Sequence, residues 1–176
     1  MTDARFEDGA PRQPLNLAAV DGDDVTVISA LLQDSVLPVT EMRWQPAQRR
    51  FALLANRFRW EDAATAEQRS APERVQSLLI IDDALRVATQ GLDRGNTDVV
   101  LSLLTLAFEP AEDGAGRITL TFAGDGAIAI DVECVNLRLR DVTRPYLAPS
   151  RTVPRHADLQ AVLPRVSCLA ERLGGG

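Results

Sequence analysis

The chain contains no lysine. All 19 of its basic residues are arginines, against 25 acidic residues, and the formal net charge is −6. A protein with this net negative charge is not expected to bind phosphate backbones through its overall surface. Nucleic acid is therefore not expected as a partner. Arginine without lysine is compatible with two interpretations: a GC-rich genome, or recognition of anions by planar guanidinium groups.

Histidine and cysteine are also scarce, which removes the common metal sites. His156 is the single histidine, and Cys134 and Cys168 are the two cysteines. Their spacing matches no metal-ligand motif, so we expect no metal and no cofactor. Both cysteines lie in apolar stretches. We therefore expect reduced residues of the core, as a reducing compartment permits.

Long apolar runs are missing as well. The longest, 99–108, is about half of the roughly 20 residues that a membrane span needs, and the polar N-terminus does not resemble a signal peptide. We expect a cytoplasmic protein without membrane contact. Its length of 176 residues suits a flexible arm (1–14), one domain (15–173) and a disordered tail (174–176).

Alternation of apolar and polar residues dominates the chain from residue 36 onward, and it predicts strands. The predicted strands are residues 15–20, 36–44, 50–58, 74–81, 84–89, 98–109, 117–123 and 127–140. Most of the links between them, 45–48, 82–83, 91–96, 111–116 and 124–126, are short, which is typical of antiparallel neighbours. The segment 59–73 is expected to be a surface loop or a short helix.

Helical spacing occurs at both ends of the chain. Residues 24–34 form a predicted helix, and Asp21, Asp23 or Asp24 can cap its first turn. Residues 159–173 have helical spacing interrupted by Pro164. The predicted fold class is α+β: an antiparallel curled sheet or a small pleckstrin-like barrel of about seven strands, with an N-terminal helix and a C-terminal helical tail.

Two of the predicted strands carry further information. The run 98–109 is apolar at both odd and even positions, so we expect a central strand covered on both faces. In 127–140 the apolar positions change from even to odd between Cys134 and Asn136. This change predicts a bulge or a sharp bend where the sheet curls or closes.

Arginine and aromatic residues concentrate between positions 43 and 60. Guanidinium planes stack on indole rings, and such surfaces bind anions. The candidate ligand-binding residues are Arg43, Trp44, Arg50, Arg57, Arg59 and Trp60. If the hairpin pairs these segments, Trp44 should lie near Phe58 or Trp60. The alternative is an ordinary sheet surface whose aromatics pack and whose arginines pair with carboxylates.

We therefore expect a non-enzymatic binding module that recognises a small anionic molecule or an acidic protein partner. The competing class is an enzyme that combines Asp131 or Glu133 with Arg138 or Arg140 in a barrel mouth. A third class, weak nucleic-acid binding by the same hairpin, conflicts with the net charge. The segment Gly91–Asn96 is interpreted as hairpin turn chemistry rather than as a phosphate-binding loop.

Several stretches together resemble an uncharacterised alphaproteobacterial family. They are Leu17–Asp21, Val27–Val36, Arg50–Trp60, Ile130–Cys134 and Leu139–Val142. The family is DUF2948, a domain of unknown function, and the resemblance covers most of residues 15–147. It implies a bacterial cytoplasmic origin and carries no catalytic residues over to this chain.

Overall fold

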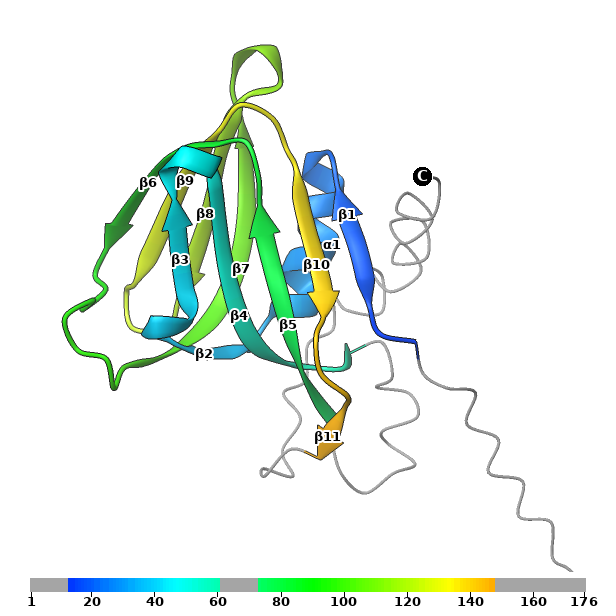
Figure 1. Ribbon diagram of the computed structural model, residues 1–176. Coiled ribbons are helices and arrows are strands. Elements are labelled where there is room, and N and C mark those ends of the chain that lie inside the picture. Colours follow the sequence, from blue (N-terminus) through cyan, green and yellow to red (C-terminus); the bar gives the residue numbers. More distant parts are fainter. Residues whose placement is uncertain (1–12, 61–72, 148–176) are drawn as a thin grey trace, which may run out of the picture.

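A computed structural model describes residues 13–60 and 73–147 of the chain (Figure 1). Within them lie one α-helix, α1 (Gly22–Leu32), and three 3₁₀ turns (Val39–Glu41, Pro46–Gln48 and Glu112–Gly114). The strands are β1 (Asn16–Ala19), β2 (Val36–Pro38), β3 (Met42–Gln45), β4 (Arg50–Phe58), β5 (Glu73–Ile81), β6 (Ala84–Gln90), β7 (Val100–Pro110), β8 (Gly116–Phe122), β9 (Ala127–Val132), β10 (Leu137–Asp141) and β11 (Tyr146–Leu147).

All pairings in the sheet are antiparallel, in the order β1-β10-β5-β4-β2-β7-β8-β9-β6, with β3 beside β4 and β11 beside β5. The end strands β1 and β6 do not pair with each other, so the sheet is open. The predicted α+β curled sheet is confirmed, and the closed-barrel alternative is wrong. The predicted helical tail lies outside the described residues.

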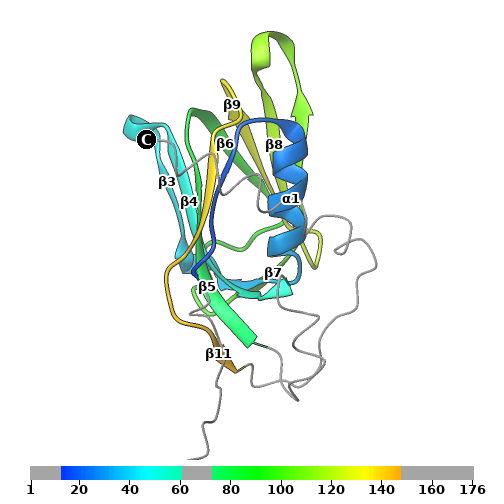
Figure 2. The ribbon, with the colours of Figure 1, turned by 90° about the vertical axis from the view of Figure 1, so that its right-hand side faces the viewer.

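The sheet curls into two walls that face each other across the core. We call β1, β10, β5, β4 and β3 the β4 wall, and β7, β8, β9 and β6 the β8 wall. The short strand β2 pairs with both β4 and β7 and so joins the walls. In Figure 2, α1 lies across the core from β4 and β5, beside β7 and β8.

Strict alternation explains why β4 and β5 were located correctly from the sequence. On β4, Phe51, Leu53 and Ala55 point inward and are buried, while the residues between them are partly exposed. On β5, Leu79 and Ile81 do the same. Burying a large aliphatic side chain contributes about 1.5–3 kcal/mol, so a one-residue slip of either strand would be strongly unfavourable.

Helix α1 begins where its carboxylates predict. The Asp21 carboxylate accepts a hydrogen bond from the Asp24 amide (2.8 Å), and the Asp24 carboxylate accepts one from the Val20 amide (3.0 Å). This exchange satisfies amides at the helix start that have no partner within the helix. The capping prediction is confirmed. The Ser29 hydroxyl accepts from the Leu106 amide (2.9 Å) and ties the helix to β7.

Strand β7 is central, between β2 and β8, but it is not covered on both faces. Its pairing with β8 shifts register between Leu103 and Thr105, and Leu104 is exposed. Before the shift Leu101 and Leu103 are buried, and after it Leu106 is. The run is apolar at odd and even positions because a bulge within it changes which positions face the core. It is not a strand buried on both faces.

The predicted strand 127–140 is two strands in different walls. β9 pairs with β8 and β6, whereas β10 lies between β1 and β5. The chain crosses from one wall to the other at residues 133–136, where the apolar positions change from even to odd. The bend predicted from the sequence is therefore the point at which the chain crosses between the walls. Cys134 lies on this corner and is an exposed residue, so its assignment to the core is wrong.

A second corner lies beside the first. The link Asp82-Asp83 was expected to join antiparallel neighbours, but β5 and β6 lie in different walls. Asp83 adopts a left-handed backbone (φ 58°) that turns the chain sharply. The Glu133 amide donates to the Asp83 carbonyl (3.0 Å), and the Asp82 amide donates to the Asn136 carbonyl (2.9 Å). Backbone hydrogen bonds thus join the two segments that cross between the walls.

The predicted links 45–48, 111–116 and 124–126 do join paired neighbours. The predicted link 91–96 does not, because β6 and β7 are not neighbours. It is a connection between separate parts of the β8 wall. Predictions for 61–72, His156, the helix 159–173 and Cys168 lie outside the described residues.

Candidate functional site

The hairpin β3–β4 does not hold the six predicted residues on one surface. Register pairs Trp44 with Phe51, seven residues before Phe58, so the prediction that Trp44 lies near Phe58 or Trp60 is wrong. Arg43 and Arg50 lie on the outside of the β4 wall, and Trp44 faces inward. The other three residues lie at the far end of β4 and just beyond it.

At that far end, Arg57 is completely buried and pairs with Asp141. Its Nη2 lies 3.0 Å from both Oδ1 and Oδ2 of Asp141, and its Nε donates to the Ser77 hydroxyl (2.9 Å). The Ser77 hydroxyl itself donates to Asp141 Oδ1 (2.6 Å). A guanidinium held in this way serves the structure and is closed to a ligand.

Arg59 and Trp60 are buried as well. Arg59 Nη1 donates to Glu73 (3.2 Å), and Trp60 Nε1 donates to the Gln33 carbonyl (3.3 Å). The rings of Phe58 and Trp60 lie 5.3 Å apart between centroids. For this half of the hairpin, the interpretation as packed aromatics and paired arginines describes what the side chains do.

The first half of the hairpin borders a hollow between the two walls. Trp44, Met42 and Phe51 line it from β3 and β4, and Val87, Thr89 and Ile128 line it from β6 and β9. Leu92, Arg94, Val39, Thr40 and Arg43 complete the rim. We call this hollow the Trp44–Arg94 pocket. Its volume of about 200 Å³ is below the roughly 300–1,000 Å³ typical of sites for drug-sized ligands.

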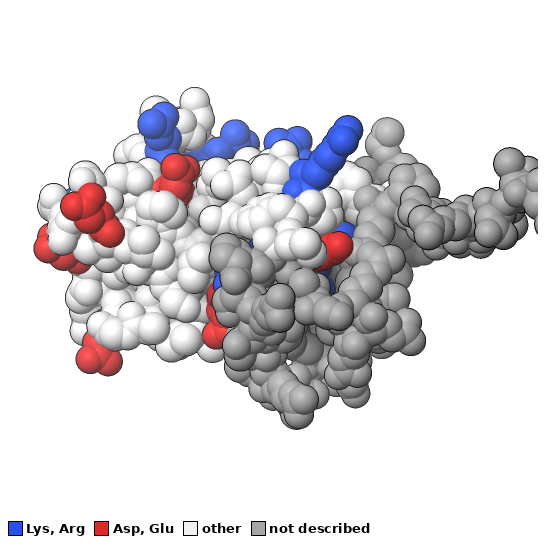
Figure 3. Space-filling view, turned by 90° about the horizontal axis from the view of Figure 1, so that it is seen from below, with Lys and Arg blue, Asp and Glu red and all other residues white. Residues whose placement is uncertain are grey.

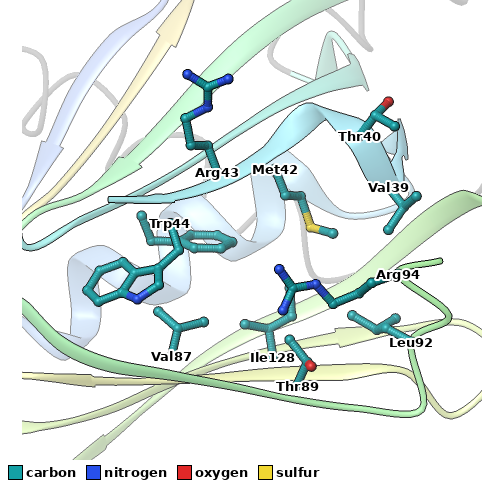
Figure 4. Close-up of a pocket in the computed structure, with 11 residues that line it drawn as sticks. Val39, Thr40, Met42, Arg43, Trp44, Val87, Thr89, Leu92, Arg94 and Ile128 are labelled. Carbon is teal, nitrogen blue, oxygen red and sulfur yellow. The ribbon is translucent and has the colours of Figure 1, made fainter. Parts of the chain in front are cut away.

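Arg94 is the charged group that faces this pocket. In Figure 4 the Arg94 guanidinium points toward Met42 and Trp44. The Arg43 guanidinium points away from the pocket, because Arg43 and Trp44 are successive residues of β3 and their side chains point to opposite faces. Among the described residues, neither arginine has a hydrogen bond or an ion pair. The pocket therefore offers an aromatic and aliphatic wall with one unneutralised cation.

The loop that carries Arg94 is held in place from both sides. Gly91 has φ 65° and packs against the backbone of Asp125, and Leu92 fills the space beside Gly126. The Asp93 carboxylate accepts from the Gly95 amide (3.1 Å). Arg94 was not among the predicted site residues, because its loop was interpreted as a hairpin turn. The available signal was an arginine between two glycines.

The residues of the competing enzyme interpretation do not come together. Asp131 pairs with Arg117 (2.7 Å), and Glu133 pairs with Arg49. These partners lower the pKa of Asp131 and raise the pKa values of Arg117 and Arg49. No Asp or Glu is among the described residues that line the Trp44–Arg94 pocket. A general acid or base is thus missing from the described part of its wall.

The corner between the walls holds the one described thiol. The Asp83 carboxylate accepts from Asn136 Nδ2 (2.8 Å) and from the Cys134 thiol (3.4 Å), and these bonds lower the pKa of Asp83. Burial and the neighbouring carboxylate of Asp83 raise the pKa of Cys134. A thiol is nucleophilic as its thiolate, so this cysteine is poorly suited to covalent chemistry.

Within residues 13–60 and 73–147, no cluster of three or more His, Cys, Asp or Glu residues is placed to hold a metal ion. No helix in these ranges has the length and apolar character to cross a membrane.

The fold and the pocket define a curled antiparallel β domain with a small aromatic site between its two walls. The chain belongs to the family described as "Protein of unknown function (DUF2948)", whose model matches residues 15–156. The predicted resemblance is confirmed. No curated protein and no solved structure matches the chain.

Proposed function

We propose that this protein is a binding module for a small anion with a flat apolar body, held in the Trp44–Arg94 pocket. One observation carries the proposal: a guanidinium without a described ion-pair partner points into a hollow lined by aromatic and aliphatic side chains. An aromatic or unsaturated carboxylate has the matching chemistry. Its anionic group would meet Arg94, and its flat face would lie against Trp44.

The size of the pocket supports a small ligand, or one end of a larger one. Thr40 and Thr89 add hydroxyl groups at the rim that can accept or donate hydrogen bonds. The proposal includes a cytoplasmic location, because the free thiol of Cys134 is of a kind that a reducing compartment preserves.

The test uses benzoate, its neutral analogue benzamide, and the two indole N–H resonances of the protein. We expect benzoate to shift the indole resonance of Trp44 and to leave that of buried Trp60 in place. Benzamide should shift neither, because it lacks the charge that Arg94 selects. The variant Arg94→Ala should abolish the shift. Equal shifts with benzamide, or normal binding by Arg94→Ala, would refute the proposal.

Two further variants complete the design. Thr89 is exposed at the rim, so Thr89→Trp should fill the pocket and block benzoate without lowering the melting temperature. Arg86 lies on β6 next to the pocket-lining Val87 but does not line the pocket itself. Arg86→Ala is the matched control, and it should bind benzoate as the natural sequence does.

A further inference from the structure

We infer that the outer face of the β4 wall is a docking surface for an acidic amphipathic helix of a partner protein. This surface is separate from the interior of the Trp44–Arg94 pocket and does not depend on the proposed function. Its floor is apolar although it points away from the core. Ala52 and Leu54 on β4, and Leu78 and Ile80 on β5, are outward-facing and only partly buried.

Register places these residues in two rows across the wall. In the first row Arg43 pairs with Ala52, Ala52 with Ile80, and Ile80 with Arg138. The second row joins Leu54, Leu78 and Arg140 in the same manner. Each row therefore has an apolar centre with an arginine beside it on β10, and the first row has an arginine on both sides of that centre. Beyond β10, Ala18 and Asn16 of β1 pair with Arg138 and Arg140.

These bordering arginines are available to a partner. Arg43, Arg138 and Arg140 are exposed, and none has a hydrogen bond or ion pair with a described residue. Arg50, on the same face, is neutralised by Asp82 (2.6 Å). Figure 3 shows basic side chains gathered along its upper edge, which is the face turned to the viewer in Figure 1.

The dimensions suit a single helix. Three strand spacings separate β3 from β10, so the two arginine borders stand about 14 Å apart at the backbone. An α-helix with its side chains is about 10–12 Å across. A hollow of about 430 Å³ opens on this face, lined in part by Leu54, Leu78 and the exposed Val142. A helix can rest on the apolar floor and direct carboxylates to both borders.

Charge decides which occupant fits. The residues after 147 carry four arginines against one aspartate and one glutamate, so this chain's own tail would repel the arginine borders. A second copy docking face to face would bring the same three arginines. Nucleic acid does not need an apolar floor, and Glu41 at the rim would oppose it. An acidic helix with one apolar stripe satisfies both the floor and the borders.

The experiment titrates the full-length protein into a fluorescein-labelled helical peptide of about 15 residues, with leucines on one face and glutamates on both flanks. We expect saturable anisotropy that weakens as salt rises, because the screening length falls from about 10 Å at 0.1 M to about 3 Å at 1 M. The double variant Arg138→Glu/Arg140→Glu should weaken binding about tenfold or more, since it replaces attraction with repulsion at one border.

The controls separate the alternatives. Arg117→Glu on the β8 wall should bind as the natural sequence does, and the peptide with glutamine in place of glutamate should bind about tenfold more weakly. If the reversal lowers the melting temperature, Arg138→Gln/Arg140→Gln replaces it. A peptide of residues 155–173 and a DNA oligonucleotide should bind more weakly than the acidic peptide, and light scattering should give a monomer before and after the reversal.

The inference would be overturned by any of four results. They are no saturable binding of the acidic peptide, equal binding of the glutamine peptide, tighter binding of DNA or of the tail peptide, and a dimer that the charge reversal dissociates.

Discussion

Arg57 and Asp141 form a buried ion pair across a strand that belongs to neither of them. Arg57 lies on β4 and Asp141 on β10, and the intervening β5 contributes Ser77, which bonds to both. The second oxygen of Asp141 accepts from the Leu15 amide (2.9 Å), just before β1. One carboxylate thus holds three strands and the entry to a fourth in register.

Removing one partner of this pair should cost much more than removing an exposed ion pair. We expect Asp141→Leu to lower the free energy of unfolding by about 3–5 kcal/mol, because it leaves the Arg57 charge buried without compensation. The double variant Arg57→Met/Asp141→Leu should lose less than the sum of the single changes. Urea denaturation measures these differences. In the exposed pair Arg49–Glu133, Glu133→Ala should cost about 0–1 kcal/mol, and a similar cost for Asp141→Leu would contradict the structure.

Asp83 should control the reactivity of Cys134. Burial raises the Cys134 pKa, and the Asp83 carboxylate, which accepts from the thiol, raises it further. Asp83→Asn should therefore lower that pKa and accelerate alkylation. Asparagine tolerates the left-handed backbone at this position, so the corner should remain folded. The measurement is the rate of iodoacetamide labelling against pH in a Cys168→Ser background. An unchanged rate profile would show that the carboxylate does not govern the thiol.

The same carboxylate should contribute to acid sensitivity. The pKa of Asp83 is lowered in the folded state, chiefly by its hydrogen bond from Asn136. Its contribution is therefore present above the unfolded pKa, near 3.8, and is lost as pH falls through the lower folded pKa. Urea midpoints at pH 7, 4 and 3 should fall less steeply for Asp83→Asn than for the natural sequence. Asp131 has a pKa shifted in the same direction, so some acid sensitivity should remain.

Alanine substitutions at two glycines should distinguish the cost of backbone strain from the cost of a steric clash. Gly91 and Gly124 both have positive φ, but a Cβ at Gly91 would lie 2.5 Å from the Asp125 carbonyl oxygen, whereas at Gly124 it would meet nothing within 4 Å. Gly124→Ala should cost about 1–2 kcal/mol from strain alone. Gly91→Ala should cost more and should also weaken benzoate binding, because it displaces the loop of Arg94. Equal losses of stability would indicate that the contact with Asp125 is unimportant.

Local patterns predicted individual elements well and their assembly poorly. Residues 50–58 were located where β4 lies, because Phe51, Leu53 and Ala55 alternate with partly exposed residues along that strand. The links 82–83 and 91–96 were assigned to hairpins, since nothing local distinguishes a short turn between neighbours from a short connection between strands that do not pair. Arg57 was expected at a surface because its partner Asp141 is 84 residues away. Arg94 gained its importance only from residues that the curled sheet brings opposite it.

The wall crossing at residues 133–136 sets the order in which the protein can be completed during synthesis. Strand β10 fills the place between β1 and β5, yet it leaves the ribosome after both of them and after the whole β8 wall. Until residues 137–141 emerge, an apolar edge of β5 has no neighbour and can pair with other chains. Nascent chains that stop before β10 should therefore aggregate, and those that include it should not.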